Sequence, residues 1–187
     1  HDFGSIEDRR RWFMVFYTQG IDMDLSKLEP TAVLRPKLGD YLEDVPLDRY
    51  NPMPGLLAKQ DRDMEAGKGF KMQLVNADTT KIGVIGKDYN KNRSTEPKVQ
   101  HPKQPSQLRL LTPTEHANIK DFPAACLGDL SVTASHQLLG QSVDVRPVRA
   151  LFKRIGTELR KWNGTVMASK VTSKVSAAPT PSSAIYH

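Results

Sequence analysis

The chain has 187 residues, of which 38% are hydrophobic and 26% are charged, and its formal net charge is +6. This length allows one ordinary hydrophobic core, or a small domain together with the edge of a second one. No apolar run approaches the roughly 20 residues of a membrane span, which argues against a membrane protein, and the positive charge is consistent with a polyanionic partner. Because Cys126 is the only cysteine and no secretory leader is visible, we expect a cytoplasmic protein without internal disulfides.

The first part of the chain combines one strand-like run with a long irregular stretch. Residues 11–17 (Arg-Trp-Phe-Met-Val-Phe-Tyr) are aromatic and β-branched, which predicts a buried strand with Arg9 and Arg11 at its start. Between residues 21 and 72 five prolines interrupt the pattern, so we predict short turns and one helical turn near residues 40–42.

The middle of the chain is predicted to hold two short strands and a basic loop. Residues 71–75 and 81–85 are expected to be strands joined by a turn, and the polar, proline-containing residues 88–107 to be an extended loop. Residues 81–109 carry seven cations against Asp88 and Glu96; the cations are Lys81, Lys87, Lys91, Arg93, Lys98, Lys103 and Arg109. This concentration of charge favours a surface for a polyanion, the alternative being an ordinary solvated loop.

Helix signals are clearest in the last third. Thr112-Pro113-Thr114-Glu115 is a capping box with proline at the first helical position, which predicts a helix that ends before Pro123. Residues 145–162 place apolar and basic side chains on opposite faces at helical spacing, which predicts an amphipathic helix. After Gly164 the composition becomes rich in Ser, Thr, Ala and Pro, as in flexible tails.

Three short segments follow one another along the chain in a characteristic order. Glu7-Asp8-Arg9-Arg10-Arg11 lies within residues 3–13, directly before the expected strand. Residues 109–123 begin Arg-Leu-Leu-Thr-Pro-Thr-Glu and end Asp-Phe-Pro, and residues 138–143 read Leu-Leu-Gly-Gln-Ser-Val. In this order and spacing the segments resemble the eighth, ninth and tenth motifs of the cytosine-5 DNA methyltransferases, a resemblance that covers about residues 1–160.

The resemblance includes four departures from the family's pattern. Glu7 stands where motif eight has glutamine, and Gln141 stands where motif ten more often has asparagine. Asn118 and Asp121 stand where motif nine usually has arginine and glycine, which bears on how that segment packs. The variable stretch between motifs eight and nine corresponds to the family's target-recognition region.

The resemblance implies an α/β fold with three parts: the edge of a doubly wound (Rossmann-like) methyltransferase sheet, a small irregular β-rich target-recognition domain and a C-terminal helix. Residues 1–25 would then end the catalytic large domain, and residues 26–108 would form the target-recognition domain. Residues 109–163 would carry motifs nine and ten back to the large domain, and residues 164–187 would be a flexible tail.

The implied reaction is transfer of a methyl group from S-adenosylmethionine to C5 of a cytosine flipped out of double-stranded DNA. In that family a Pro-Cys loop supplies a thiolate nucleophile and a Gly-rich loop binds the cofactor, and neither is identifiable in this sequence. We therefore expect the chain to be inactive alone and to need an N-terminal catalytic part, either in the same polypeptide or as a second subunit. No metal-binding motif is present.

Each motif assigns roles to particular residues by resemblance. Arg11 would donate to O2 of the flipped cytosine, and Arg9 would hold the loop or a phosphate; the structural alternative is a buried arginine pair. Gln141 and Ser142 would line the cofactor pocket, unless this segment is a plain turn at a helix start. The residues expected to contact DNA are Lys87, Tyr89, Lys91, Arg93 and Arg109.

Two other interpretations stay open. The chain could be a non-catalytic DNA-binding protein that retains the recognition region, which would hold if no upstream Pro-Cys and Gly-rich loops accompany it. The departures at Glu7, Asn118 and Asp121 also allow a degenerate remnant without a stable fold. The sequence predicts neither the recognised DNA site nor an accompanying restriction nuclease.

Overall fold

The computed structural model describes residues 3–21, 23–26, 28–29, 35–68 and 71–176, the last ten of these as backbone only. The chain divides into two compact units. The first unit comprises His1–Phe13 and Pro30–Arg149, and the second comprises Met14–Glu29 and Ala150–His187. None of the helices among the described residues is long and apolar enough to cross a membrane.

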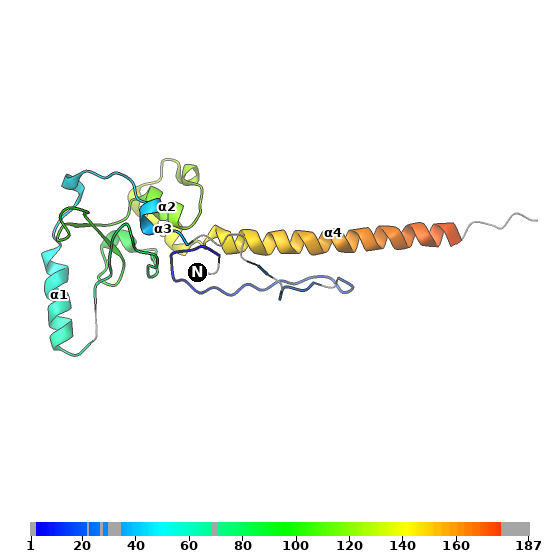
Figure 1. The fold of residues 1–187 in the computed structure, drawn as a ribbon, viewed down its shortest axis with the longest axis horizontal. Coiled ribbons are helices and arrows are strands. Elements are labelled where there is room, and N and C mark those ends of the chain that lie inside the picture. The colour runs from blue at the N-terminus through cyan, green and yellow to red at the C-terminus, as the bar shows by residue number, and fades with distance from the viewer. Residues whose placement is uncertain (1–2, 22, 27, 30–34, 69–70, 177–187) are drawn as a thin grey trace, which may run out of the picture. The chain divides into compact units, whose positions relative to one another are not determined.

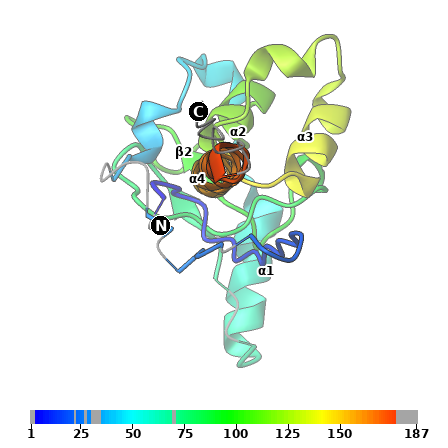
Figure 2. The ribbon, with the colours of Figure 1, turned by 90° about the vertical axis from the view of Figure 1, so that its right-hand side faces the viewer.

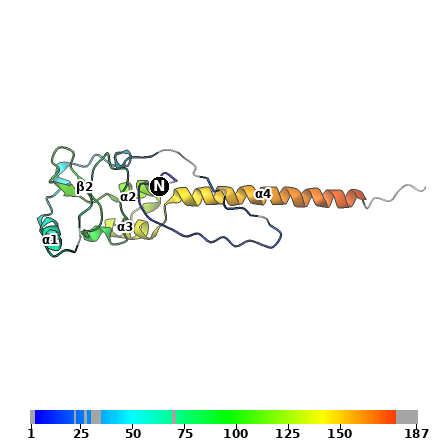
Figure 3. The same ribbon diagram turned by 60° about the horizontal axis from the view of Figure 1, so that its bottom comes forward.

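The first unit is α/β and contains three α-helices beside a small mixed sheet (Figure 1). The helices are α1 (Pro54–Glu65), α2 (Pro113–Ile119) and α3 (Val132–Gln141), and the strands are β1 (Leu74–Val75), β2 (Lys98–Gln100) and β3 (Leu108–Arg109). β2 is central, parallel to β1 and antiparallel to β3, so that Val99 lies opposite both Val75 and Arg109. In Figures 2 and 3, α1 stands apart from α2 and α3.

Short 3-10 turns complete this unit and lie at Leu38–Asp40, Leu47–Arg49, Tyr89–Lys91 and Ala124–Leu127. The first of them confirms a helical turn in the proline-interrupted region, two residues before its predicted place. The same region also contains α1, which the sequence analysis did not predict. Pro54 occupies the first helical turn of α1, where its missing amide costs little.

The predicted start of α2 is confirmed. Thr112 Oγ1 accepts a hydrogen bond from the Glu115 amide at 3.1 Å, and the Glu115 carboxylate accepts one from the Thr112 amide at 2.8 Å. Two of the helix's otherwise unpaired amides are thereby satisfied. At α3, Ser131 acts as the N-cap and accepts from the Ala134 amide at 3.2 Å.

One hydrophobic cluster joins the motif-eight segment to the sheet and to α2. Its fully or nearly fully buried members are Ile6, Leu38, Val75, Ile82, Ile85, Tyr89, Val99, Leu111 and Ile119. Ile6 comes from motif eight, whereas Leu111 and Ile119 come from motif nine. Segments more than 100 residues apart in the sequence are therefore held by the same core.

The predicted strand at residues 11–17 does not form. Its side chains are largely exposed, with Trp12 at 98%, Met14 at 84% and Phe16 at 88%. A strand is stable only when a neighbouring strand satisfies its amides and carbonyls, and no described segment pairs with these residues. These residues are apolar, as a buried strand requires, but no neighbouring segment among the described residues buries them.

The predicted pairing of residues 71–75 with residues 81–85 is also wrong. β1 pairs instead with β2, which lies inside the stretch predicted to be a loop, and Ile82 forms an isolated parallel bridge with Glu7. Hydrophobic periodicity identifies extended segments but does not say which segments pair. Cβ atoms added at Gly83 and Gly86 would lie 2.8 Å from side-chain atoms of Gln73 and Glu96, respectively.

The amphipathic helix is confirmed as α4 (Val145–Ser176), which continues well past the predicted end at Trp162. Asn163 and Gly164 weaken a helix without breaking it, and the following residues include no proline before Pro179. The rest of the predicted tail, residues 177–187, lies outside the described residues. Within the second unit Arg154 donates to the Asp24 carbonyl at 3.0 Å and pairs with Glu158 at 2.9 Å.

Candidate functional site

The motif-eight segment is fixed by the side chain of Glu7, which is 4% exposed. One carboxylate oxygen accepts from the Ile85 amide at 2.9 Å, and the other accepts from Lys120 Nζ at 2.5 Å. Lys120 is fully buried at the C-terminal end of α2. The position where the family has glutamine is therefore one half of a buried ion pair with motif nine.

The three arginines that follow differ in their surroundings; we call residues 8–11 the arginine turn. The Arg9 side chain is 14% exposed and lies 3.8 Å from the Glu7 carboxylate, and its Nε and Nη1 atoms are buried without a hydrogen-bond partner. Arg11 is exposed, and its Nη1 donates to the Arg10 carbonyl at 2.8 Å. Arg9 and Arg11 are thus not a mutually buried pair.

The basic loop, residues 87–93, carries three exposed cations, Lys87, Lys91 and Arg93. Lys91 and Arg93 pair with Asp88 at 3.0 and 2.8 Å. The hydrogen bond from Lys91 lowers the pKa of Asp88, which keeps its carboxylate ionised beside the cations. Three cations against one carboxylate leave this surface positive, as a phosphate-binding surface requires.

Tyr89 was expected to contact DNA, but its side chain is fully buried and does not face solvent. Its hydroxyl donates to the Pro97 carbonyl at 2.7 Å and accepts from the Leu111 amide at 3.0 Å. Burial raises the pKa of Tyr89, so that the phenol stays neutral. Tyr89 anchors the basic loop to motif nine and cannot contact a base from this position.

Two histidines that look scattered in the sequence meet beside Tyr89. The Nδ1 atoms of His116 on α2 and His136 on α3 are 3.0 Å apart, and both rings are buried. Burial lowers the pKa of His116 to about 2 and that of His136 to about 4. Two neutral imidazoles can share one hydrogen, so this contact joins α2 to α3 and is structural.

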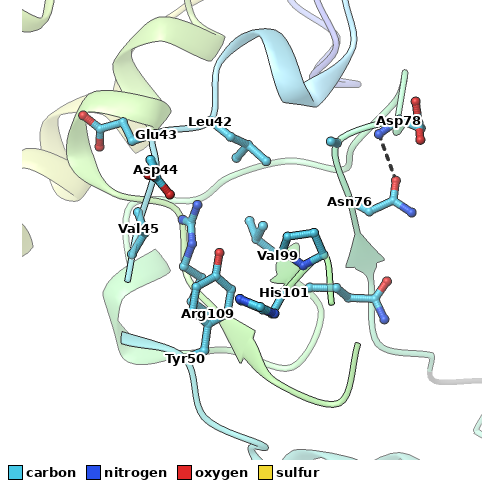
Figure 4. A pocket seen from close by; sticks show the side chains of 13 residues that line it. Leu42, Glu43, Asp44, Val45, Tyr50, Asn76, Asp78, Val99, His101 and Arg109 are labelled. Atoms are coloured by element: carbon cyan, nitrogen blue, oxygen red, sulfur yellow. Dashed lines mark hydrogen bonds between the residues drawn. The ribbon is translucent and has the colours of Figure 1, made fainter. Parts of the chain in front are cut away.

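Arg109 was also expected to contact DNA, and it too is buried. It is 4% exposed and makes a two-pronged pair with Glu115, with nitrogen–oxygen distances of 2.6 and 2.7 Å. Its guanidinium also lies 5.3 Å from the Tyr50 ring centre, and Figure 4 shows the two side chains together. With its charge neutralised and its surface covered, Arg109 supports the start of α2.

The wall formed by Arg109 and Tyr50 belongs to a cavity of about 330 Å³ (Figure 4). Its rim carries three exposed carboxylates, from Glu43, Asp44 and Asp78. Like charges repel, so this cavity is unsuited to a DNA phosphate.

A second cavity, of about 320 Å³, is lined in part by Asn90 and Asn92 of the basic loop and by residues at the starts of α2 and α3. The side-chain oxygens of both asparagines are buried and lack a hydrogen-bond partner. Sequence analysis missed these residues, although the alternation of amide and cationic side chains in Tyr-Asn-Lys-Asn-Arg was a usable signal. Their amide nitrogens donate to the Thr133 hydroxyl at 2.8 Å and to the Met53 sulfur at 3.5 Å, so both side chains hold the loop in place.

The residues expected at the cofactor lie at the end of α3, not at a helix start. Gln141 is the last helical residue and is exposed, whereas Ser142 is the C-cap and its hydroxyl donates to the Leu139 carbonyl at 2.8 Å. Just before them, a Cβ atom added to Gly140 would lie 2.3 Å from the Lys87 amide nitrogen. Motif ten therefore packs directly against the base of the basic loop.

Asp121 and Asn118, which depart from the family's motif-nine pattern, differ in their surroundings. Asp121 adopts a φ of 53°, the left-handed conformation that favours glycine, and its carboxylate pairs with Arg149 at 2.7 Å. Asn118 is exposed, and Arg146 instead donates to the Ile119 carbonyl at 3.0 Å, at the end of α2.

Comparisons with known proteins place these features in a family. A family model described as C-5 cytosine-specific DNA methylase matches residues 1–157. The type II methyltransferase M.NlaX of Neisseria lactamica is 28% identical over 162 residues, which cover 84% of this chain and 50% of that protein. The type II methyltransferase M1.ScrFI of Lactococcus lactis subsp. cremoris is 27% identical over 166 residues, which cover 86% of this chain and 42% of that protein.

Solved structures agree on the fold. The Entamoeba histolytica methyltransferase EhMeth superposes with a TM-score of 0.57 at 18% identity, over 84% of this chain and 51% of that one. The Dnmt2 methyltransferase of S. pombe superposes with a TM-score of 0.51 at 19% identity, over 68% of this chain and 42% of that one. The chain spans about half the length of the curated relatives that it matches.

Proposed function

Because the chain belongs to the C-5 cytosine-specific DNA methylase family, we propose that it is the C-terminal part of a DNA (cytosine-5-)-methyltransferase. In this proposal the complete enzyme transfers a methyl group from S-adenosylmethionine to C5 of a cytosine flipped out of double-stranded DNA. The observation that carries the proposal is the arginine turn, in which the motif-eight resemblance coincides with an exposed guanidinium at Arg11 and with a second guanidinium, that of Arg9, beside the Glu7 carboxylate. An exposed guanidinium can donate charge-assisted hydrogen bonds to an anionic group on the substrate.

The arginine turn would act on charge that develops during the reaction. Attack of a thiolate on C6 of cytosine places negative charge on the ring, and a guanidinium that donates to O2 stabilises it. Arg11, which is exposed, would make this contact, and Arg9, beside the Glu7 carboxylate, would hold the loop or a phosphate. The thiolate itself would come from the catalytic half.

The basic loop would hold the DNA. Lys87, Lys91 and Arg93 are exposed and would contact phosphates, which fixes the position of the duplex without reading its sequence. Asn90 and Asn92 are left out of this proposed interface, because their amide oxygens are buried and their amide nitrogens donate to Thr133 and Met53. Tyr89 and Arg109 are left out of this proposed interface because both are buried.

The end of α3 fits a peripheral role at the cofactor. The Gln141 side chain is exposed and can donate or accept hydrogen bonds, whereas the Ser142 hydroxyl is already bonded to Leu139 but can still accept one. Bound S-adenosylmethionine would supply the methyl group. Gln141 would orient a polar part of the cofactor, and Ser142 would hold the end of α3 in place.

The catalytic half is the partner that this proposal requires, in the same polypeptide or as a separate subunit. The side chains of Trp12, Met14 and Phe16 are exposed and apolar, and they lie two residues apart, so they would share one face if this segment formed a strand. Burying such a face against another protein surface is favourable. Residues 11–17 would then become the strand that their composition predicts, by pairing with the sheet of the catalytic half.

A methyl-transfer assay tests the proposed function. With labelled S-adenosylmethionine and cytosine-containing duplex DNA, we expect no transfer by this chain alone and transfer to C5 when it is joined to, or mixed with, its catalytic half. Transfer to another atom or to no DNA at all would contradict the proposal. If duplex binding persisted without transfer, the chain would be a DNA-binding module. Since its relatives are type II methyltransferases, a restriction-modification role is proposed with it.

Neutralising the basic loop should weaken DNA binding in a salt-dependent way. We expect the triple variant Lys87→Gln, Lys91→Gln and Arg93→Gln to lower affinity for every duplex sequence and to reduce the slope of log K against log salt by up to about three. The measurement is a fluorescence-anisotropy titration at several salt concentrations. The control removes the same charge from exposed lysines elsewhere in the first unit, at positions 37, 59 and 68. An unchanged slope in the loop variant would place the DNA on another surface.

A further inference from the structure

We infer that Glu7 is a positioning residue whose buried pair with Lys120 fixes the arginine turn against the base of the basic loop. The placement of Arg9 and Arg11 then depends on one rigid junction. The inference rests on the proposed function, because positioning has meaning only if the arginine turn acts on the substrate.

The junction begins with the backbone on either side of Glu7. The Ile82 amide donates to the Ile6 carbonyl, and the Asp8 amide donates to the Ile82 carbonyl, both at 2.8 Å. The Glu7 carboxylate adds the bond from the Ile85 amide at 2.9 Å. These three bonds hold residues 6–8 along residues 82–85.

Lys120 supplies a fixed cation at this junction. Its amide donates to the Ala117 carbonyl at 3.0 Å, and its carbonyl accepts from the Val145 amide at 2.9 Å, so its backbone is held on both sides. Its side chain is fully buried and ends on the Glu7 carboxylate. A buried charge is stable only when it is paired, so each of the two side chains requires the other.

The same junction is the base of the basic loop. Ile85 lies two residues before Lys87, and the Gly86 amide is held by the Glu96 carboxylate at 3.0 Å. Gly140 of α3 packs against the backbone of Gly86 and Lys87, with no room for a Cβ atom. The first cation of the loop is therefore anchored by motifs eight, nine and ten together.

Glu7 also acts on Arg9, two residues later. The guanidinium lies 3.8 Å from the Glu7 carboxylate, close enough for electrostatic attraction but without a hydrogen bond that would occupy its donors. The carboxylate thus holds the Arg9 side chain in place by charge attraction. This arrangement gives Glu7 a role that packing alone would not require.

The test uses the complete enzyme, this chain with its catalytic half. Glu7→Gln keeps the shape but leaves the Lys120 ammonium unpaired, and displacement of the turn should lower kcat about 10²-fold. KM for DNA should change less than about threefold, because the loop cations are unaltered. Glu7→Gln combined with Lys120→Gln also removes the unpaired ammonium of Lys120. This double variant should restore kcat to within about tenfold of the wild type. Glu65→Gln makes the same chemical change at an exposed position on α1 and serves as the control.

Hydrogen exchange provides a readout that does not depend on activity. The Ile85 amide should exchange slowly in the wild type, faster in Glu7→Gln and slowly again in the double variant. Rapid exchange in the wild type, or normal kcat in Glu7→Gln beside a wild type that methylates cytosine, would overturn the inference alone. A wild-type enzyme that transfers no methyl group would overturn the proposed function, and with it the role of Glu7 in catalysis.

Discussion

Replacing Arg11 with alanine should lower kcat of the complete methyltransferase by about 10²- to 10³-fold, the usual effect of removing one donor from a site that stabilises developing negative charge. Arg11 is exposed, and within the described part of the chain its side chain bonds to the neighbouring Arg10 carbonyl, so its loss should disturb little packing there. Duplex binding should therefore be nearly unchanged. Single-turnover methyl transfer at saturating DNA, combined with a binding titration, measures both quantities.

Two further variants test how Arg11 works. Arg10→Ala removes an adjacent exposed guanidinium and should leave kcat close to that of the wild type, since the carbonyl that Arg11 contacts belongs to the backbone. Arg11→Lys keeps the positive charge but loses the planar fork of donors, and should fall between wild type and Arg11→Ala. If DNA binding collapsed in Arg11→Ala while kcat held, Arg11 would be an anchor for the duplex.

The helices that could be predicted are those whose signals are local. The capping box at Thr112 and Glu115 defines the start of α2 within four residues, and the apolar stripe of α4 repeats over five turns. α1 was missed because it lies in a segment with five prolines, although Pro54 begins the helix and does not break it. Local chemistry thus predicts a helix well when proline is read by its position.

The strands and the buried charges could not be predicted in the same way, because they depend on partners distant in the sequence. Lys98 pairs its backbone with Gln73, and Glu7 meets Lys120 across more than 100 residues. In both pairs, the local sequence of one segment does not indicate which distant segment it contacts. Residues 11–17 show the converse case, since their composition predicts burial that the described part of this chain does not provide.

The candidate site shows the same limit. A cation or an aromatic residue within a polar stretch of sequence is predicted to be exposed. This prediction is correct for Lys91 and Arg93 and wrong for Tyr89 and Arg109. Tyr89 is buried by its hydroxyl contacts with Pro97 and Leu111, and Arg109 by a carboxylate six residues later. The resemblance located the segments correctly, whereas the structure decides which of their side chains reach solvent.

The largest effect on stability should come from Glu115→Ala, which we expect to lower the free energy of unfolding by about 3–5 kcal/mol. The Glu115 carboxylate accepts from both terminal nitrogens of Arg109 and from the amides of Glu43 and Thr112, and its side chain is fully buried. Its removal leaves a buried guanidinium without a counter-ion and opens the cap of α2. Urea denaturation followed by far-ultraviolet circular dichroism gives the free energy.

A double variant separates the ion pair from the cap. Arg109→Met with Glu115→Leu removes both charges together, and buried pairs replaced by apolar side chains of similar volume often lose little stability. We expect the double variant to recover most of the loss and to keep a deficit of about 1–2 kcal/mol, because the Thr112 and Glu43 amides stay without their acceptor. Glu65→Ala, at the exposed end of α1, is the control and should leave the urea midpoint nearly unchanged. If Glu115→Ala were no more destabilising than Glu65→Ala, Arg109 would have to reach solvent, and its predicted contact with DNA would regain support.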